Sequence, residues 1–518
     1  MTKHIIISAL LVVVTFSVSA QGLYDVSRYA NTDIMGTARY MSLAGSMGAI
    51  GGDPSAIFDN PGALGIYRSS EVSFTLNATP SVTFAKSANF YNRERDFFFN
   101  FNQLTFVLAI PSGKDEGYVS TNFSFSYNRL KDFNRTVSVL DNNTSSMGNA
   151  LATLADGFAP SNLVEENAFA PYLPILGYQG YAINTLETDS FSYSPYSNKT
   201  KQMGYRGIEN GRIDEYNLTY AANIGHYLYF GVGLGVQTLH YSFTSTNAES
   251  YDVGLYALEN RFVASGVGAV VRVGLIARPV SFLRLGLSFQ SPVWYSMTDS
   301  YKGSATSQGI LDDHSNVDYS TPRAGSDYDF NSPLKVQASL GFVIGKTALI
   351  NVDYQYSHNK GMRLIDKSAN SGIFSTPMFD FENNDIRQNA LNSHLVKVGA
   401  EFRIAQRFSI RAGAAYETQN IVTGAARYLM DNTTRTDMEM FADRGTIYAA
   451  GGFGYRYNGF GIDITYAYNR HNQVFAPFQQ NAEVDNGYFG PTANGSTPYL
   501  ADIHTNRHNV VLTLLYKF

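Results

Sequence analysis

The sequence contains no cysteine among its 518 residues. This absence excludes a disulfide scaffold, a thiolate metal site and a cysteine nucleophile. Charged residues are scarce, at 16%, and the net charge of −5 excludes the basic surface that nucleic-acid binding requires. After residue 20, no stretch reaches the roughly 18 consecutive apolar residues that a transmembrane helix needs.

The first 20 residues have the features of a secretory signal peptide. Lys3 gives a basic start, an apolar run extends from Ile5 to Val14, and the small residues Val18 and Ala20 precede the expected cleavage site. The apolar run is too short to cross about 30 Å of hydrocarbon. We therefore expect an exported protein whose mature chain begins at Gln21.

Aromatic residues and glycine are abundant, with 36 Tyr, 35 Phe and 45 Gly. This composition suits a transmembrane β-barrel, which carries aromatic girdles on both sides of a lipid-facing apolar band. From Glu71 onward the dominant period is two. In Val119–Asn128 the odd positions are mostly apolar and the even positions are serine or asparagine. A soluble half-buried sheet shows the same alternation, so the number and spacing of such segments must decide.

We predict fourteen strands joined by connections that alternate strictly between long and short. The strands cover residues 71–80, 100–110, 117–133, 212–224, 227–245, 260–278, 281–302, 333–345, 347–360, 393–405, 407–421, 444–457, 459–472 and 507–518. The long connections are 81–99, 134–211, 246–259, 303–332, 361–392, 422–443 and 473–506. Short periplasmic turns and long extracellular loops alternate in this way in outer-membrane barrels with an even number of strands.

The predicted fold is therefore all-β, a 14-stranded antiparallel transmembrane β-barrel formed by residues 71–518. Both termini are expected in the periplasm of a Gram-negative bacterium, and the long loops outside the cell. In the last strand, alternate positions that face the same side carry Val510, Leu512, Leu514, Tyr516 and Phe518. This pattern resembles the C-terminal signal that barrel assembly machinery recognises, so we expect that machinery to be a partner.

The stretch Gly45–Leu64, which precedes the first strand, has a different character. Asp53-Pro54 predicts a helix start, with aspartate as the N-cap and proline at the first helical position. Asn60-Pro61-Gly62 predicts the end of that helix after about two turns. The resulting group of short helices and turns is too small to bury a core of its own, so we expect the barrel to enclose it.

The sequence GGDPSAIFDNPGALG in this stretch resembles the hatch of FadL-type outer-membrane transport proteins, which are channels for long-chain fatty acids and aromatic hydrocarbons. That hatch has an acidic residue, a short helix and Asn-Pro-Ala; the match falls on Asp53, Ile57, Phe58, Asn60, Pro61 and Leu64, and Gly62-Ala63 departs from it. Four later segments resemble the same family: Leu283–Ser296, Ser332–Phe342, Ser409–Glu417 and Gly452–Tyr468.

The resemblance implies a fourteen-stranded barrel whose lumen is plugged by an N-terminal hatch, here residues 21–70. The gate residues carried over from the motif are Asp53, Phe58, Asn60, Pro61 and Gly62. The family's lateral exit into the bilayer depends on a kink in the third strand. Tyr118–Phe133 contains neither glycine nor proline to make such a kink, which weakens the lateral route. It does not exclude that route, because a bulge can arise without either residue.

Nothing in the sequence indicates catalysis, and we expect neither an enzyme nor a cofactor. The nine histidines show no metal-binding pattern, and the spacing of His504 and His508 across a loop-to-strand junction is attributed to chance. Gly231, Gly233 and Gly235 imitate a nucleotide-binding loop, but that motif must turn from a strand into a helix. Within a strand, these glycines are predicted to clear lumenal space for the hatch.

Side chains alternate between the two faces of a strand, and we predict that the charged ones face the lumen because a charge on the lipid face costs a few kcal/mol. The candidates are Arg272, Arg284, Asp353, Lys397, Glu401, Arg403, Arg411, Glu417 and Asp463. The first interpretation is an ion-pair network that braces the barrel wall and the hatch. The second is that Lys397, Arg403 or Arg411, on neighbouring strands, binds a ligand carboxylate in a mostly apolar pocket.

The resemblance implies passive uptake of a hydrophobic small molecule, long-chain fatty acid or aromatic compound, through a hatch-gated channel. The longest loop, 134–211, contains the amphipathic patch Ala150–Phe158 and the aromatic run Ala170–Tyr181, which suit capture of such a ligand. The alternative is a barrel-anchored surface protein whose loops bind haem or a host or partner ligand without transport. We expect a monomer in contact with outer-membrane lipid and lipopolysaccharide.

Two other classes of barrel are less compatible with the sequence. A plain polar porin is disfavoured because the hatch-like segment would block it. A TonB-type receptor is excluded because its roughly 22 strands and large plug need a longer chain. Deletion of residues 45–64 distinguishes a channel, which should leak, from an anchor, which should bind its partner unchanged.

Overall fold

Polar side chains occupy the inner face of the strands and apolar side chains the outer face. In β3 (Tyr118–Asp132), Asn122, Ser124 and Ser126 are buried, whereas Phe123 and Phe125 are 40% and 55% exposed. A soluble sheet has the opposite arrangement, with its apolar face buried. A polar interior inside an apolar outer band is typical of a membrane-spanning barrel.

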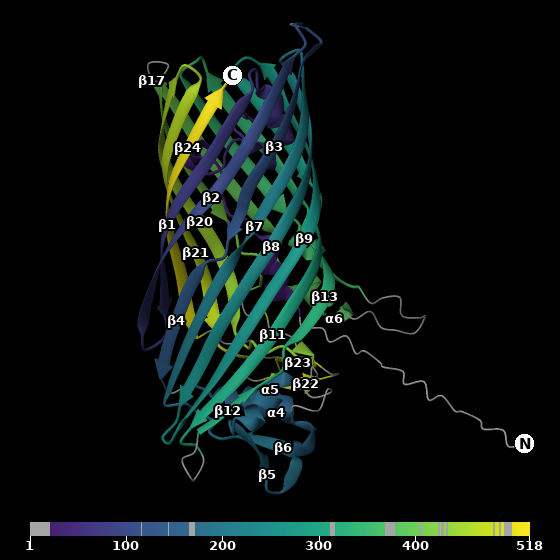
Figure 1. Ribbon diagram of the computed structural model, residues 1–518, viewed down its shortest axis with the longest axis vertical. Coiled ribbons are helices and arrows are strands. Elements are labelled where there is room, and N and C mark those ends of the chain that lie inside the picture. The colour runs from purple at the N-terminus through teal and green to yellow at the C-terminus, as the bar shows by residue number, and fades with distance from the viewer. Residues whose placement is uncertain are drawn as a thin grey trace, which may run out of the picture.

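The computed structural model describes residues 21–114, 116–142, 144–164, 171–310, 316–367, 379–404, 407–422, 425, 429–430, 434–479, 482–485, 488–491 and 500–518. The chain forms one tall barrel, with the C-terminus at one end and a small helical group at the other (Figure 1). The predicted signal peptide, residues 1–20, lies outside the described residues.

The barrel closes when the first strand pairs with the last, from Glu71↔Lys517 to Lys86↔Asp502. Four barrel strands are interrupted and consist of two pieces each, so that the closed antiparallel sheet has the predicted 14 strands. In order they are β1 (Glu71–Lys86), β2 (Tyr91–Pro111), β3 with β4 (Arg135–Asn142), β7 (Gln202–Ile224), β8 (Leu228–Ser250), β9 (Leu255–Val280), β10 (Leu283–Gln290) with β11 (Trp294–Gln308), β13 (Ala324–Asn331) with β14 (Lys335–Ile344), β15 (Ala348–Ser357) with β16 (Arg363–Asp366), β17 (Ser393–Ile404), β18 (Phe408–Glu417), β20 (Met440–Tyr457), β21 (Phe460–Ala476) and β24 (Ala501–Lys517).

The predicted strict alternation of connection lengths is wrong at two places. The connection between β1 and β2 is only residues 87–90, and that between β8 and β9 only residues 251–254. Both strand pairs continue through the segments 81–99 and 246–259, which were expected to be loops. Beyond the apolar band β8 carries polar residues on both faces, as in Thr244, Ser245 and Thr246, and the exposed face of β2 carries Arg93 and Arg95. Hydrophobic alternation therefore no longer reveals these strands.

The third barrel strand is broken. β3 matches the predicted strand 117–133, but the strand resumes as β4 at Arg135, where a loop was expected. β2 pairs with β3 only from Gln103↔Asn128 to Pro111↔Ser120, and the β3–β7 ladder has an irregularity between Arg129 and Lys131. A bulge of this kind needs neither glycine nor proline. β4 then pairs with β7 and not with β2.

Side chains join β2 to β4 where no backbone ladder does. Thr136 donates from its backbone nitrogen and its hydroxyl to the Asp96 carboxylate, at 2.9 and 3.0 Å. Asn89, in the turn just before β2, donates to Asp141 of β4 at 2.6 Å. We call this stretch of wall, between residues 91–102 and 129–142, the seam.

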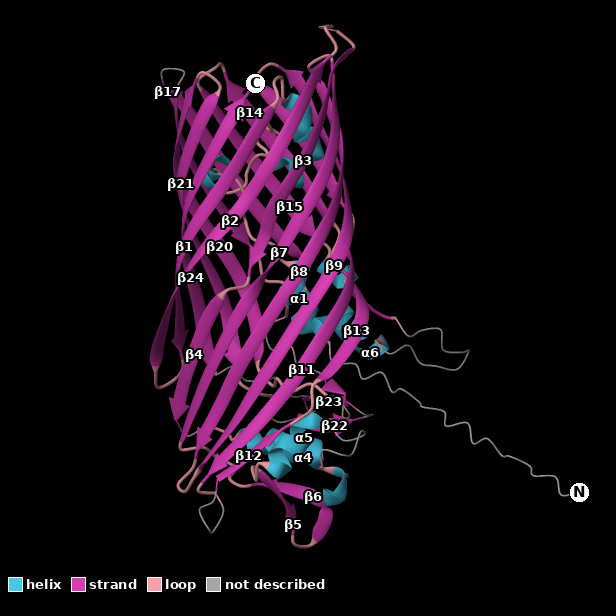
Figure 2. Ribbon diagram, in the orientation of Figure 1, coloured by secondary structure: helices cyan, strands magenta, loops and turns pink. Residues whose placement is uncertain are grey.

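The remaining elements lie inside the barrel or at its far end. Inside are α1 (Leu23–Ala30), α2 (Ala38–Ser42), α3 (Ala56–Asp59) and the 3-10 helix η1 (Pro61–Ile66). Figure 2 shows these helices within the wall and the helices α4 and α5 beyond its lower rim. The other elements are α4 (Met147–Ala155), η2 (Pro160–Asn162), α5 (Tyr172–Gln179), β5 (Ile183–Leu186), β6 (Asp189–Pro195), β12 (Asn316–Ser320), η3 (Asn359–Gly361), α6 (Asp380–Asn389), β19 (Leu429–Met430), β22 (Ala482–Asp485) and β23 (Tyr488–Pro491).

In the part of the chain that the structure describes, four buried clusters occupy the interior, and one of them joins Leu64 and Tyr67 to Val107 and Ala221 of the wall. The other three lie at different heights. One surrounds residues 34–63 at the short-turn half of the barrel, and a second surrounds α1 at mid-height. The third lies beneath α4 and α5 and closes the end with the long connections. Among the described residues, no helix is both long and apolar enough to cross a membrane.

Candidate functional site

The segment 22–66, which we call the hatch, fills the lumen as short helices joined by turns. Thr37 caps α2 by accepting a hydrogen bond from the backbone nitrogen of Tyr40 at 3.1 Å. Asp53 does not cap a helix at Pro54 as predicted; its carboxylate accepts from the Ser55 backbone nitrogen at 2.9 Å, and α3 begins at Ala56. α3 has a single turn, one fewer than expected.

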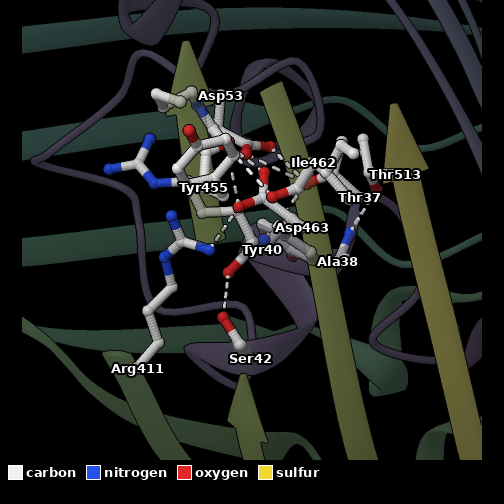
Figure 3. A network of polar contacts seen from close by, with 12 residues as sticks. Thr37, Ala38, Tyr40, Ser42, Asp53, Arg411, Tyr455, Ile462, Asp463 and Thr513 are labelled. Carbon is white, nitrogen blue, oxygen red and sulfur yellow. Dashed lines mark hydrogen bonds and ion pairs between the residues drawn. The ribbon is translucent and has the colours of Figure 1, made fainter. Parts of the chain in front are cut away.

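Asp53 also joins two segments of the hatch, the turn before α3 and the start of α2. Its carboxylate accepts from the Thr37 hydroxyl at 2.8 Å, while the backbone nitrogen of Ala38 donates to Thr513 in β24 at 2.7 Å. Figure 3 shows this chain of contacts beside Asp463 and Arg411. Burial raises the pKa of the Asp53 carboxyl above its ordinary value, and the positive charge of Arg39 opposes that rise.

Asn60 joins the hatch to itself and to the wall. Its side-chain amide donates to the carbonyls of Gly48 at 2.8 Å and of Leu275 in β9 at 3.2 Å. Its side-chain oxygen accepts from the Gly62 backbone nitrogen at 2.9 Å, which starts η1 at Pro61. The Asn-Pro-Gly sequence is therefore the point at which the hatch contacts the sheet.

Glycines in the wall allow the hatch backbone to approach closely. A Cβ added to Gly231 would lie 2.3 Å from the carbonyl carbon of Pro61, and one added to Gly274 would lie 2.0 Å from Asn60 Oδ1. Of the eight neighbouring barrel strands from β8 to β20, every one except the strand containing β15 contributes one such glycine, with a hatch atom within 2.8 Å of the added Cβ. These residues are Gly231, Gly274, Gly286, Gly341, Gly399, Gly413 and Gly452. We call this set the glycine seat.

The prediction for the Gly231, Gly233 and Gly235 series thus holds at its first position. Gly233 and Gly235 face Thr219 and Glu215 of the neighbouring strand and not the hatch. Within β8, only Gly231 lies at the level where the backbone of η1 comes close to the wall.

Lys397 is fully buried and makes its contacts with carboxylates and an amide. Its ammonium nitrogen lies 2.7 Å from Asp59 Oδ2 in the hatch and 3.9 Å from Asp353 Oδ2 in β15. It also donates to Gln337 at 3.0 Å. Asp59 in turn accepts from the Tyr40 hydroxyl at 2.8 Å. Lys397 therefore links the wall to the hatch, as the first interpretation of the lumenal charges expects.

Arg411 belongs to a second ionic cluster on the short-turn side of the hatch. Its guanidinium contacts Glu401 at 2.7 Å and Asp463 at 2.6 Å. Glu401 also accepts from Arg39 of the hatch at 2.8 Å, and Asp463 pairs with Arg456 at 2.6 Å. The positive charge of Arg411 is thus balanced by two buried carboxylates.

Arg403 differs from the other two candidates, because its side chain is 49% exposed and its guanidinium is 3.9 Å from Glu401. The structure brings Arg403 and Arg411 together around Glu401 and places Lys397 apart from them. The alternation of side chains along each strand identified Lys397, Arg403 and Arg411 as inward-facing. It could not identify their partners Asp59, Arg39 and Gln337, because these lie on other elements.

The part of the hatch farthest from the short turns, α1, occupies an aromatic chamber. Tyr29 stacks edge-on against Tyr241 and Phe330, with ring centroids 6.1 and 6.5 Å apart. Phe58, a predicted gate residue, is buried in the same cluster. Asp25 of α1 forms an ion pair of 2.6 Å with Arg435, which anchors the helix.

The two cavities described beside α1 are small and lined by polar groups. Their volumes are about 80 and 70 Å³, with Asp33, Lys131 and Glu417 around the first. The mostly apolar pocket expected above the hatch is therefore filled by α1 in this closed arrangement. No group of three His, Asp or Glu side chains suited to a metal ion occurs in the described part of the chain.

Comparisons with protein-family models and with curated proteins found no match. Among solved structures, the chain is similar to a FadL homologue of Pseudomonas aeruginosa, with 12% identity, a TM-score of 0.51, and coverage of 96% of this chain and 100% of that one. It is also similar to the TodX deltaS2S3 mutant, a monoaromatic hydrocarbon channel, with 10% identity, a TM-score of 0.51, and coverage of 94% and 99%. The chain has the fold of FadL-type barrels, as the hatch motif indicated.

Proposed function

We propose that this protein is an outer-membrane channel for passive uptake of hydrophobic small molecules, long-chain fatty acids or aromatic compounds, gated by its N-terminal hatch. The observation that carries the proposal is the way the lumen is blocked. Within the described residues, the hatch rests on the glycine seat and forms no ladder with the barrel strands. Side-chain bonds and one backbone bond, from the Asp33 nitrogen to the Leu130 carbonyl at 2.8 Å, hold it in place. Such a segment can move without breaking the wall.

The fold supports this proposal, since the similar structures are a FadL homologue and a monoaromatic hydrocarbon channel. In our proposal the short turns and the C-terminus are periplasmic, and the long loops with α4 and α5 are extracellular. The expected start of the mature chain lies inside the lumen, where the buried Gln21 donates to Asp299 of β11 at 3.0 Å. The protein acts as a monomer, lies in lipid and lipopolysaccharide, and is inserted by the barrel assembly machinery.

The apolar outer band provides a test of the proposed location. Ile464 is exposed on the outer face of β21, between Phe453 and Leu512 of the neighbouring strands. Ile464→Arg is expected to lower the free energy of unfolding from a bilayer by about 2–4 kcal/mol, because a cation then faces hydrocarbon. Urea titration of the protein in vesicles measures this change. Thr244→Arg, above the band, should change it by less than about 1 kcal/mol.

The proposed route begins at the extracellular end, where α4, α5 and the cluster beneath them meet a ligand. The ligand then replaces α1 against Tyr241 and Phe330 in the aromatic chamber. Release requires that the gate residues Asp53, Phe58, Asn60, Pro61 and Gly62 leave the glycine seat. In this scheme Lys397 and Arg411 are freed for a ligand carboxylate only when the hatch moves, whereas Arg403 is accessible throughout.

The seam supplies a second exit, sideways into the membrane. At this place β2 and β4 are joined by Asp96, Asp141 and their partners and not by backbone pairing. Opening the seam therefore breaks side-chain contacts and no backbone ladder between β2 and β4.

Locking the hatch to the wall tests the gating proposal directly. A Cβ on Gly341 would lie 3.3 Å from the Cβ of Ala49, close to the 3.5–4.5 Å that a disulfide requires. Because the chain has no cysteine, Ala49→Cys with Gly341→Cys creates a single defined pair. Flux of a fluorescent long-chain fatty acid into proteoliposomes is expected to stop in the oxidised protein and to return on reduction.

Each single-cysteine variant serves as a control and should transport under both conditions. Equal flux through the locked and reduced forms would contradict hatch gating. The absence of flux from every form would contradict transport altogether.

A binding protein anchored by the barrel is the second candidate, and one observation favours it. The extracellular group has its own core, with Leu151, Leu154 and Leu176 fully buried beneath α4 and α5. In that case haem or a partner protein should bind the locked and the reduced forms with equal affinity, since the hatch would be irrelevant.

A further inference from the structure

A cavity of about 580 Å³ lies on the short-turn side of the hatch. Its walls come from residues 50–54 of the hatch and from the turns after β14, β17 and β20. We call this cavity the vestibule. It is several times larger than the two cavities beside α1, and it is separated from them by the hatch.

Cationic side chains outnumber carboxylates in the lining of the vestibule. Eight side chains are cationic: Arg39, Arg284, Lys346, Arg403, Arg407, Arg411, Arg456 and Lys517. Four are carboxylates: Asp53, Glu71, Glu401 and Asp463. The excess of four positive charges distinguishes this cavity from the protein as a whole, whose net charge is −5.

The carboxylates are already occupied. Glu401 accepts from Arg39 and Arg411, Asp463 from Arg411 and Arg456, and Glu71 lies 3.2 Å from Lys517. Asp53 is buried and accepts from the Thr37 hydroxyl and the Ser55 backbone. None of these groups has capacity to balance the remaining cations.

The remaining cations are Arg284, Lys346, Arg403 and Arg407. Within the described ranges, Arg284, Lys346 and Arg407 form no ion pair, and Arg403 reaches Glu401 only at 3.9 Å. Arg284 donates to the Ile50 carbonyl at 2.7 Å, and its buried Nε has no hydrogen-bond partner. A buried donor without a partner, among unbalanced cations, indicates a place for an anion.

Apolar side chains adjoin these cations. Ile50 and Ile66 of the hatch and Val343 and Leu349 of β14 and β15 line the same cavity. A small inorganic anion makes no use of this surface. A molecule with an oxyanion headgroup and a hydrocarbon chain would contact both parts at once.

We propose that the vestibule is a binding site for the oxyanion headgroup, carboxylate or phosphate, of a single-chain amphiphile. The headgroup lies among Arg284, Lys346, Arg403 and Arg407, and the start of the chain contacts Ile50 and Ile66. This proposal rests on the proposed function for the delivery of the amphiphile through the hatch. It adds a second site, distinct from the aromatic chamber, that holds the ligand as an anion after it passes.

A fluorescent label in the vestibule tests the site in the full-length protein. Thr347 is exposed and lines the cavity, and Thr347→Cys labelled with bimane would be the only thiol position. The probes are 5-doxylstearate, whose nitroxide lies near the carboxylate, and its uncharged methyl ester. Quenching by the acid is expected to saturate at a concentration about tenfold lower than quenching by the ester.

Two double variants that remove the same charge separate the site from general electrostatics. Lys346→Gln with Arg403→Gln should remove the preference for the acid. Arg261→Gln with Lys302→Gln, exposed on the long-loop half of β9 and β11, should leave it unchanged. All four side chains are exposed, so none of these substitutions threatens folding.

The remaining outcomes identify the source of the anion or overturn the proposal. Displacement by excess inorganic phosphate would show that a free oxyanion suffices, and its failure would show that headgroup and chain are recognised together. Equal quenching by acid and ester overturns the vestibule site, whatever the flux measurements show. Preference for the acid in a protein that transports no fatty acid would retain the site and reject the proposed transport.

Discussion

Replacing Lys397 with alanine is expected to destabilise the closed hatch by about 3–5 kcal/mol, because breaking a buried ion pair leaves uncompensated charges. Asp59 would lose its 2.7 Å contact with the ammonium group, and Asp353 in the wall would lose its nearest cation. Amide hydrogen exchange in residues 45–66 of the purified protein measures the effect. Exchange there should become at least about a hundredfold faster than in the unaltered protein.

A matched control lies on the same strand. Arg403→Ala removes an equal charge from a side chain that is 49% exposed, and it should change hatch exchange by less than about threefold. Asp59→Asn combined with Lys397→Met removes both charges of the closest pair and should restore the part of the protection that was lost through Asp59, while Asp353 still lacks its cation. Unchanged exchange in Lys397→Ala, with weaker fatty-acid binding, would instead make Lys397 a ligand residue and not a hatch anchor.

Gly231→Val is expected to displace the hatch from its seat. The new Cβ would lie 2.3 Å from the backbone of Pro61, and backbone cannot turn aside as a flexible side chain can. Overpacking typically costs about 1–3 kcal/mol, and here the strain is relieved only if the hatch moves. We expect discrete conductance events in planar bilayers at a frequency at least about tenfold above that of the unaltered protein.

Gly233→Ala provides the comparison, two residues along the same face of β8. Its Cβ would lie 3.3 Å from the Thr219 hydroxyl and would not touch the hatch. Its conductance should match that of the unaltered protein. If both variants remain silent and the hatch retains its protection from exchange, the glycine seat does not control opening.

The barrel was predictable because its signal is local. Residues such as Phe123 and Ser124 face opposite sides of a strand wherever that strand lies, and lipid demands apolar residues on one of those sides. The same signal failed at 81–99, where β1 and β2 continue with Arg93 and Arg95 among the aromatic residues on the exposed face of β2. It also failed at the break after Asp132, because a bulge leaves no mark in composition.

The candidate site was predictable only in part. The alternation of side chains placed Lys397, Arg403 and Arg411 inward, and the hatch motif placed Asn60 and Pro61 before the first strand. Alternation could not distinguish Lys397 from Arg403, which share a strand and a face. The hatch covers the wall at the level of Lys397 and ends before the level of Arg403, so one cation is buried and the other is exposed.

The sequence by itself determined a fourteen-stranded barrel with a polar interior and a hatch motif ahead of it, because each of these depends on neighbouring residues and on the surrounding solvent. The tertiary structure alone decided which lumenal charges are neutralised and which remain available. Lys397 and Asp59 are 338 positions apart, and Arg39 and Glu401 are 362 apart. Contacts across such separations arise only when the closed sheet brings its wall around the hatch, so no local pattern records them.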